Sequence, residues 1–78
     1  MKVTVEINPM MFNPSGARVK TEIELADGAT ASDLLLKLGY NPMQIKAIIP
    51  VINGVQKRTD AILKNGDDIW LTVAIGGG

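Results

Sequence analysis

One amphipathic helix among several strand-like runs is the feature that most restricts what this chain can fold into. Between two glycines, Gly28 and Gly39, apolar residues recur at helical spacing and form one stripe, made of Ala31, Leu34, Leu35 and Leu38. Before and after this stretch, apolar and polar residues alternate, which is typical of half-buried strands. Because one helix covers only one face of a sheet, the sequence predicts an α+β fold with the helix on one face and the other face in water.

The alternation defines the predicted strands. It runs over residues 2–7, 19–25 and 68–75, and the apolar positions of these runs are expected to face the leucine stripe. The stretch 47–54 is predicted to be a further strand that enters an Asn-Gly turn, with a short return strand over residues 55–58. The first two strands are expected to form a hairpin joined by a long loop. The sheet is therefore predicted to be mixed but mostly antiparallel, with four or five strands.

The boundaries of the helix carry local signals. Thr30 is placed to cap its N-terminus, and Asp33 follows three residues later, although Asp is shorter than the Glu usually found in this capping box, so an imperfect box is expected. Gly39 is expected to end the helix in a left-handed conformation. Pro42 is expected to prevent a smooth continuation of the helix.

Two further segments are predicted from their proline, glycine and apolar residues. Pro50 cannot donate a hydrogen bond to a neighbouring strand, so its strand is expected to lie at an edge of the sheet, or Pro50 to lie at a bulge or strand end. Residues 59–63 are expected to form a helical turn in which Ile62 or Leu63 fills the core. Residues 65–67 are expected to form a turn before the last strand.

Composition limits the classes of partner. The 78 residues correspond to one domain. Eight basic and eight acidic residues balance, and no basic stripe is present, so neither nucleic acid nor an anionic membrane is expected as a partner. No run approaches the ~20 apolar residues of a membrane span. The absence of cysteine fits a cytoplasmic protein.

Catalytic residue types are scarce. The chain has neither His nor Cys, which removes the commonest general base and the thiol nucleophile. Ser15 and Ser32 have no evident catalytic partner in the sequence, and no glycine-rich phosphate loop is present. A metal site would need carboxylates alone. The chain is therefore not expected to be an enzyme, to hold a metal or to bind a cofactor of its own.

Four stretches together resemble one family. They are GATASDLLLKL (28–38), INGVQ (52–56), LKNGDDIWL (63–71) and the terminal Gly77-Gly78. In this order and at this length they are similar to the ThiS/MoaD family of sulfur-carrier proteins, which have a ubiquitin-like β-grasp fold. The resemblance implies a β-grasp domain over residues 1–75 and a flexible C-terminal glycine tail over residues 76–78. Two departures are Gly76, where the family has a small non-glycine residue, and the longer loop over residues 8–17.

The resemblance implies that the chain is a substrate of other enzymes. A ubiquitin-activating-like adenylyltransferase would use ATP to adenylate the C-terminal carboxylate of Gly78, and sulfur would then replace AMP to leave a thiocarboxylate. The sulfur would pass to an accepting biosynthetic enzyme (a synthase). That enzyme would use it to form thiamin thiazole or the dithiolene of molybdopterin, to make a sulfur-containing amino acid, or to thiolate a tRNA. Two alternatives stay open: a ubiquitin-like modifier conjugated to lysines through the same C-terminus, and a non-covalent interaction module.

Trp70 is the main candidate for a contact with such an adenylating enzyme. If the apolar positions of the last strand point into the core, Trp70 points to the opposite face together with Thr72 and Ala74. Tryptophan is enriched at interface hot spots, so these three residues are candidate partner-binding residues. Alternatively, Trp70 covers its own face of the sheet, against Thr4 or a neighbouring strand.

Met10, Met11 and Phe12 could likewise form a binding surface or serve the domain's own core. Methionine-rich loops can form adaptable binding surfaces. The expectation here is that these three residues cap the open end of the core. Tyr40 is expected to pack beyond the end of the helix.

Overall fold

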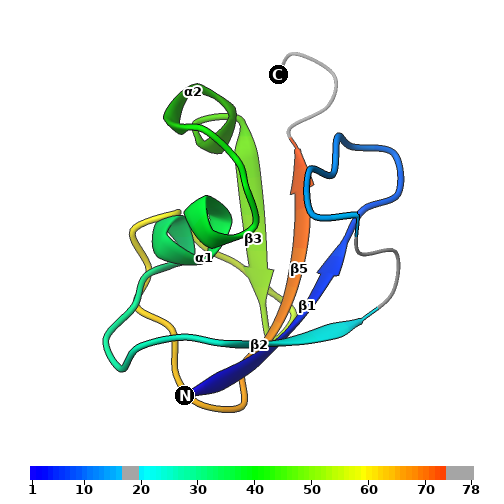
Figure 1. The fold of residues 1–78 in the computed structure, drawn as a ribbon. Coiled ribbons are helices and arrows are strands. Elements are labelled where there is room, and N and C mark those ends of the chain that lie inside the picture. Colours follow the sequence, from blue (N-terminus) through cyan, green and yellow to red (C-terminus); the bar gives the residue numbers. More distant parts are fainter. Residues whose placement is uncertain (17–19, 74–78) are drawn as a thin grey trace.

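Five strands form one mixed sheet, and both helices lie on the same side of it (Figure 1). The computed structural model describes residues 1–16 and 20–73. The order across the sheet is β2-β1-β5-β3-β4. The strands are β1 Lys2–Ile7, β2 Thr21–Glu24, β3 Ile48–Ile52, β4 Val55–Gln56 and β5 Asp68–Val73, and the helices are α1 Ala31–Lys37 and α2 Pro42–Ile45. The predicted α+β class, with a mixed sheet and one main helix on one face, is confirmed.

The first and last strands lie side by side in the middle of the sheet. β1 and β5 are parallel, with Val5 opposite Ile69. The β1–β2, β3–β4 and β3–β5 ladders are antiparallel, so the sheet is mostly antiparallel as predicted. β2 is shorter than its prediction, and Val19 lies outside the described residues. β5 pairs with β1 as far as Leu71 and with β3 as far as Val73, its last residue, which lies opposite Ile48.

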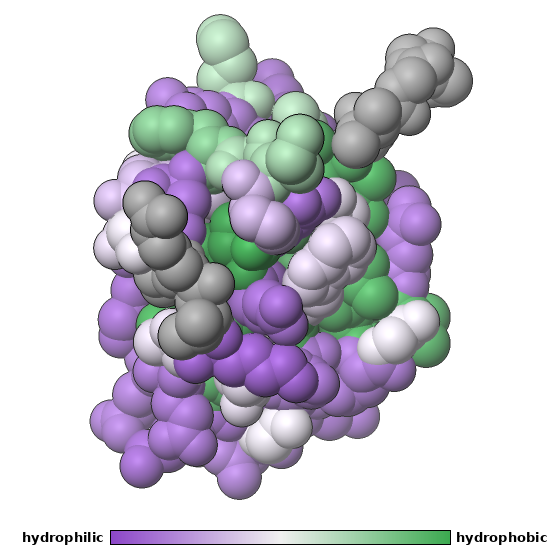
Figure 2. Space-filling view, turned by 90° about the vertical axis from the view of Figure 1, so that its right-hand side faces the viewer, coloured by the Kyte–Doolittle hydropathy of each residue, from purple (hydrophilic) through white to green (hydrophobic). Residues whose placement is uncertain are grey.

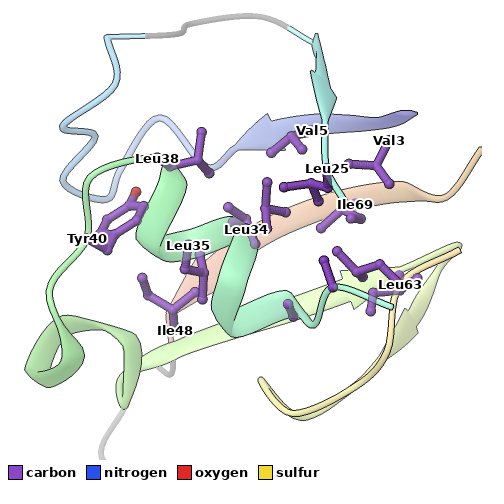
Figure 3. Close-up of a cluster of buried hydrophobic side chains, with 14 of the residues drawn as sticks. Val3, Val5, Leu25, Leu34, Leu35, Leu38, Tyr40, Ile48, Leu63 and Ile69 are labelled. Carbon is purple, nitrogen blue, oxygen red and sulfur yellow. The ribbon is translucent and has the colours of Figure 1, made fainter. Parts of the chain in front are cut away.

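The core lies between the sheet and α1 (Figure 3). The helix contributes Leu34 and Leu35, and the last strand contributes Ile69 and Leu71, all without exposed surface. These side chains occupy the apolar positions of the predicted helical stripe and of the predicted last strand. Burial therefore follows the helical period in α1 and the alternation in β5. At ~1.5–3 kcal/mol for each fully buried side chain of this size, their packing is the main stabilising contribution.

Thr30 and Asp33 form a complete capping box at the start of α1. The Thr30 hydroxyl accepts a hydrogen bond from the Asp33 N–H at 3.2 Å, and the Asp33 carboxylate accepts one from the Thr30 N–H at 2.9 Å. The shorter Asp side chain therefore reaches the N-cap, and the expectation of an imperfect box is wrong. At the other end of α1, Gly39 has a φ of 103°, so its predicted left-handed conformation is confirmed.

A second, short helix follows at Pro42, and the sequence analysis missed it. The Asn41 side chain accepts a hydrogen bond from the Gln44 N–H at 2.8 Å, and the Gln44 side chain accepts one from the Asn41 N–H at 2.9 Å. Pro42 opens this helix in its first turn, where its missing N–H leaves no broken hydrogen bond. Pro42 thus prevents α1 from continuing, as predicted, and also begins α2.

The segment between β4 and β5 differs from its prediction. Residues 59–63 contain a turn and an isolated bridge between Thr30 and Ile62, rather than a helical turn. Leu63 fills the core, whereas Ile62 is exposed. β4 also ends earlier than the predicted return strand over residues 55–58.

Pro50 is accommodated because β4 is short. β3 is not an edge strand, since β4 pairs with it at Val51 and Ile52. The Pro50 carbonyl accepts a hydrogen bond from the Lys57 N–H at 2.9 Å, and the N and C=O of one strand residue point to the same side. The missing N–H of Pro50 therefore points away from β5, beyond the end of β4. The nitrogen of Pro50 thus faces no paired strand residue, as at a sheet edge, although β3 itself lies between β4 and β5.

Asp67 joins two turns at the start of β5. Asp67 is only 9% exposed, and no other acidic or basic side chain in residues 1–16 and 20–73 is buried. One of its carboxylate oxygens accepts a hydrogen bond from the Lys64 N–H at 2.8 Å, and the other accepts one from Asn53 Nδ2 at 2.9 Å. Asn53 Oδ1 in turn accepts one from the Asp68 N–H at 2.9 Å. The predicted turns at residues 53–54 and 65–67 are therefore tied together.

Candidate functional site

β5 places Trp70 on the face of the sheet that points away from α1. Its neighbours Ile69 and Leu71 have no exposed surface, whereas Trp70 is 39% exposed. The strand register sets Trp70 beside Glu6 of β1 and Val51 of β3. Trp70 thus covers part of its own sheet face and also leaves an apolar area open, so both interpretations of this residue have a structural basis.

Thr72 lies one step further along the same face. It is half-buried opposite Ile49, and its hydroxyl oxygen accepts a hydrogen bond from Asn8 Nδ2 at 3.0 Å. The Asn8 N–H also donates to the Leu71 carbonyl at 2.9 Å. Thr72 therefore helps to hold the loop after β1 against β5. Outside the described residues lie the four other predicted site residues, Ala74, Gly76, Gly77 and Gly78.

The outer face around Trp70 combines an apolar strip with a margin of mixed charge. Ile49, Val51 and Trp70 form the strip across β3 and β5, since Val51 is the direct cross-strand partner of Trp70. Glu6 borders the strip on β1, and Glu22 follows on β2. Lys20 adds a positive charge, since its ammonium lies 3.8 Å from the carboxylate of Asp68, two residues before Trp70 in β5. An apolar centre with a polar rim is a common arrangement at protein interfaces.

A small groove opens at the carboxyl end of β5. Its volume is about 150 Å³, and its lining is uncharged and mainly apolar: Met11, Phe12, Tyr40, Gln44, Ala47, Ile48 and Val73. Pockets for small-molecule ligands usually enclose roughly 300–1,000 Å³. The groove therefore suits a single apolar side chain better than a small-molecule ligand.

Tyr40 holds Phe12 at the rim of this groove. The Tyr40 hydroxyl donates to the Phe12 carbonyl oxygen at 2.6 Å, and the two rings meet edge to face with their centroids 6.4 Å apart. Tyr40 itself is buried beyond the end of α1, as predicted. This burial raises the pKa of its phenol above the ordinary value. The hydrogen bond fixes the loop backbone and leaves the Phe12 ring largely exposed.

The loop residues Met10, Met11 and Phe12 differ from their prediction. Met11 packs against the core, as expected for a residue that caps its open end. Met10 and Phe12 are exposed instead, so their predicted capping role is wrong. α2 adds exposed Met43, which the sequence analysis did not consider; the Asn-Pro pair at residues 41–42, an N-cap followed by a helix-starting proline, is the signal that could have found this helix.

Other features of the described residues do not form a comparable site. A wider hollow of about 650 Å³ lies at the opposite end, where the N-terminal ammonium of Met1 lies 3.5 Å from the exposed Asp27 carboxylate. Within residues 1–16 and 20–73, no group of three or more acidic side chains could hold a metal ion. In the same part of the chain, no helix has both the length and the hydrophobicity needed to cross a membrane.

Comparison with known proteins identifies the fold through solved structures. No protein-family model matches the sequence, and no curated protein matches it either. SAMP1 from Haloferax volcanii has a TM-score of 0.70 at 14% identity, over 100% of both chains. A protein assigned as molybdopterin converting factor subunit 1 from Pyrococcus furiosus has a TM-score of 0.72 at 23% identity, over 95% of this chain and 98% of that chain. The chain has a ubiquitin-like β-grasp fold.

A further β-grasp relative agrees with this assignment. It is a ubiquitin-like protein from the archaeon Caldiarchaeum subterraneum, with a TM-score of 0.52 at 19% identity over 99% of this chain and 100% of that chain. The predicted similarity to ThiS/MoaD-type proteins is thus confirmed for the fold. In this β-grasp domain, the described part of the last strand connects the outer face that carries Trp70 with the groove that Val73 lines.

Proposed function

We propose that this β-grasp domain is a sulfur carrier whose C-terminal carboxylate, on Gly78, is activated by a separate adenylating enzyme. The observation that supports it most is the position of β5. This strand is hydrogen-bonded to β1 on one side and to β3 on the other, and glycines 76–78 follow it in the sequence. The fold similarity to a molybdopterin converting factor subunit also supports it. A rigid body would then present residues without Cβ atoms, which can approach a partner's backbone closely.

The chemistry needs a partner because a carboxylate is a poor electrophile, and α-carboxyl groups are ionised near neutral pH. A carboxylate oxygen would attack the α-phosphorus of ATP and displace pyrophosphate, which leaves an acyl adenylate. A sulfide or persulfide sulfur would then attack the acyl carbon, and the bond between that carbon and the AMP oxygen would break. AMP would leave. Sulfide would leave a thiocarboxylate on the carrier directly, whereas a persulfide would leave an acyl disulfide, and a thiol would then attack the donor's sulfur and displace the thiocarboxylate.

The partners would supply the catalytic groups and the nucleotide site. ATP would be bound by the ubiquitin-activating-like adenylyltransferase, and this chain would act as its substrate. A synthase of the thiamin-thiazole or molybdopterin type would accept the sulfur. Trp70, Thr72 and Ala74 would contact the adenylyltransferase, because a half-exposed Trp inside an apolar strip has the character of an interface hot spot.

Intact-protein mass spectrometry tests the activation step. The chain is incubated with ATP, a sulfur source and the adenylating enzyme of the same organism, and the expected product has one oxygen replaced by sulfur at Gly78. A variant that lacks Gly77 and Gly78 should stay unmodified and should keep the circular dichroism spectrum of the wild type. A wild-type chain that stays unmodified with every candidate adenylating enzyme would contradict the proposal. A natural chain that continues past Gly78 would favour a non-covalent interaction module.

Replacing Trp70 tests the proposed contact surface. Trp70→Ala should lower the rate of thiocarboxylate formation at low carrier concentration about 30-fold or more, since truncation of a hot spot costs at least ~2 kcal/mol. Leu36→Ala is the matched control, because Leu36 is an exposed apolar residue on α1, on the other side of the sheet. The control should react at the wild-type rate. A Trp70→Ala chain that is unfolded would show that Trp70 acts mainly by covering its own sheet.

The fold similarity to a ubiquitin-like protein supports a second candidate function, conjugation to lysines. The same acyl adenylate would then be passed to a lysine amine rather than to sulfur. Immunoblotting of cells for this chain distinguishes the two functions. A ladder of covalent conjugates that disappears on deletion of Gly77 and Gly78 would favour the modifier. A single band of the free chain, together with the sulfur mass shift, would favour the carrier.

A further inference from the structure

The molecule exposes large apolar side chains at the carboxyl end of β5, in a place that the proposed function does not yet use. Met10 is 88% exposed, Phe12 is 64% exposed and Met43 is 81% exposed. These three residues are called the carboxyl-end cluster below. Met10 and Phe12 belong to the loop after β1, and Met43 belongs to α2; both segments also line the groove beside Val73. Figure 2 shows hydrophobic side chains gathered at this end of the molecule.

The loop that carries Met10 and Phe12 is held by side-chain hydrogen bonds. Asn8 Oδ1 accepts a hydrogen bond from the Met10 N–H at 2.9 Å, while Asn8 Nδ2 donates to Thr72. The Tyr40 hydroxyl donates to the Phe12 carbonyl oxygen. The exposure of the two side chains therefore comes from a defined loop conformation. Exposed apolar side chains that gather at one end of a molecule mark a candidate interaction site.

The length of chain beyond Val73 limits where an activating enzyme can bind. Residues 74–78 follow Val73, and five fully extended residues span at most about 17 Å. The molecule is 34 Å along its longest axis. An enzyme that holds Gly78 in its active site therefore has to come within about 17 Å of Val73. This places it near the carboxyl end of β5 rather than at the end where the N-terminus lies (Figure 1).

We propose that the carboxyl-end cluster and its groove form a docking site for the adenylating enzyme, with one apolar side chain of that enzyme seated in the groove; this inference rests on the proposed function. The groove has a volume of about 150 Å³, and an apolar cavity of roughly this size accommodates a benzene-sized group. Because no lining residue is charged, the contact is apolar and only weakly dependent on salt. The flexible thioethers of Met10 and Met43 can adapt to the enzyme surface around that side chain.

The site is separate from Trp70. Trp70 lies among strand residues of the outer face, beside Glu6 and Val51. The carboxyl-end cluster lies on a loop and on α2. Substitutions in the cluster can therefore be tested with Trp70 left in place.

Steady-state adenylation kinetics test the docking site. The Met10→Ser/Met43→Ser double variant is compared with the wild type in ATP–pyrophosphate exchange catalysed by the adenylating enzyme of the same organism. We expect the KM for the carrier to rise at least 10-fold with kcat within twofold, because the substituted side chains do not touch the reacting carboxylate. Both residues are largely exposed, so the thermal midpoint should stay close to that of the wild type. Ile62→Ser is the matched control, because Ile62 is exposed near Asp67, at the opposite end of β5, and its KM should be unchanged.

Methyl-labelled methionine gives a second readout. The chain has four methionines. Met1 is at the N-terminus, which lies at the end of the molecule opposite to α2, the helix that carries Met43 (Figure 1). Met11 lines the groove beside Val73, and Met10 precedes it in the same loop. Addition of the adenylating enzyme should shift or broaden the methyl signals of the last three most strongly, with the Met1 signal least affected.

The outcomes separate this inference from the proposed function. An unchanged KM in the double variant would overturn the docking site, while the mass shift at Gly78 would leave the carrier function intact. A wild-type chain that is not adenylated would refute the carrier function and the docking site together. A dimer of the wild type that the double variant abolishes, with no change in KM, would assign the cluster to a second copy of the chain and would also overturn the inference.

Discussion

Replacing Asp67 by Ala should destabilise the domain by about 2–4 kcal/mol, because Asp67 is buried and its carboxylate accepts two short hydrogen bonds. A hydrogen bond to a charged group contributes about 1.5–3 kcal/mol, which gives an upper sum of about 3–6 kcal/mol for the two. The sum overstates the loss, because Lys64 is exposed and its freed N–H can bind water. A domain of this length is stable by about 4–12 kcal/mol, so the substitution removes a large share of the total.

Urea denaturation measures this loss. The chain has one tryptophan, Trp70, so its fluorescence reports unfolding from a single position in β5. Far-UV circular dichroism should give the same midpoint if unfolding is two-state. The m-value should stay unchanged, since the variant exposes the same surface on unfolding.

Two further variants locate the effect in the contact between Asp67 and Asn53. Asp67→Asn keeps the size of the side chain and should cost less than Asp67→Ala. Asn53→Gly removes the amide without strain, because Asn53 has a φ of 51°, in the region that glycine adopts freely. The double-mutant cycle of Asp67→Ala and Asn53→Gly should give a coupling energy of about 1–2 kcal/mol. A loss below about 0.5 kcal/mol for Asp67→Ala, or no coupling in the cycle, would refute the reasoning.

Two other predictions follow from buried residues of the domain. Leu34→Ala should cost about 2–5 kcal/mol and lower Tm by roughly 10 °C or more, while the exposed neighbour Leu36→Ala should change Tm little, as calorimetry can show. Burial raises the pKa of the Tyr40 phenol in the folded domain above the value of about 10 that it has in the unfolded chain. The stability that the neutral phenol contributes is therefore fully present below about pH 10 and is lost as the pH rises through the pKa of the folded state. Absorbance titration of this single tyrosine should give a midpoint above that in urea, and Tyr40→Phe should make stability fall less steeply above pH 10; equal midpoints would contradict the burial effect.

The local parts of the fold could be predicted from the sequence because their signals lie within a few residues. The N-cap Thr30 and the left-handed Gly39 are examples, since a cap depends on residues three or four positions apart. The alternation that buries Ile69 and exposes Trp70 depends only on strand geometry. These signals placed the core and the outer face of the last strand.

The remaining features depend on contacts between distant residues. The exposure of Phe12 is set by Tyr40, 28 positions away, and the buried Asp67 by Asn53, 14 positions away. Neither contact leaves a periodic pattern in the sequence. The missed helix α2 is a different case, because Pro42 by itself predicts only a break after the first helix. Together with Asn41 it can also cap and open a helix.

The parallel pairing of β1 and β5 has a mechanical consequence. A pulling force on the carboxyl end of β5, with the amino end of β1 held, would slide the two strands past each other along their length. Every hydrogen bond of that ladder would then carry load at once, whereas an unzipping geometry would break the bonds one after another. A partner that grips the end of this chain would therefore move the domain as a unit before it could peel β5 from the sheet.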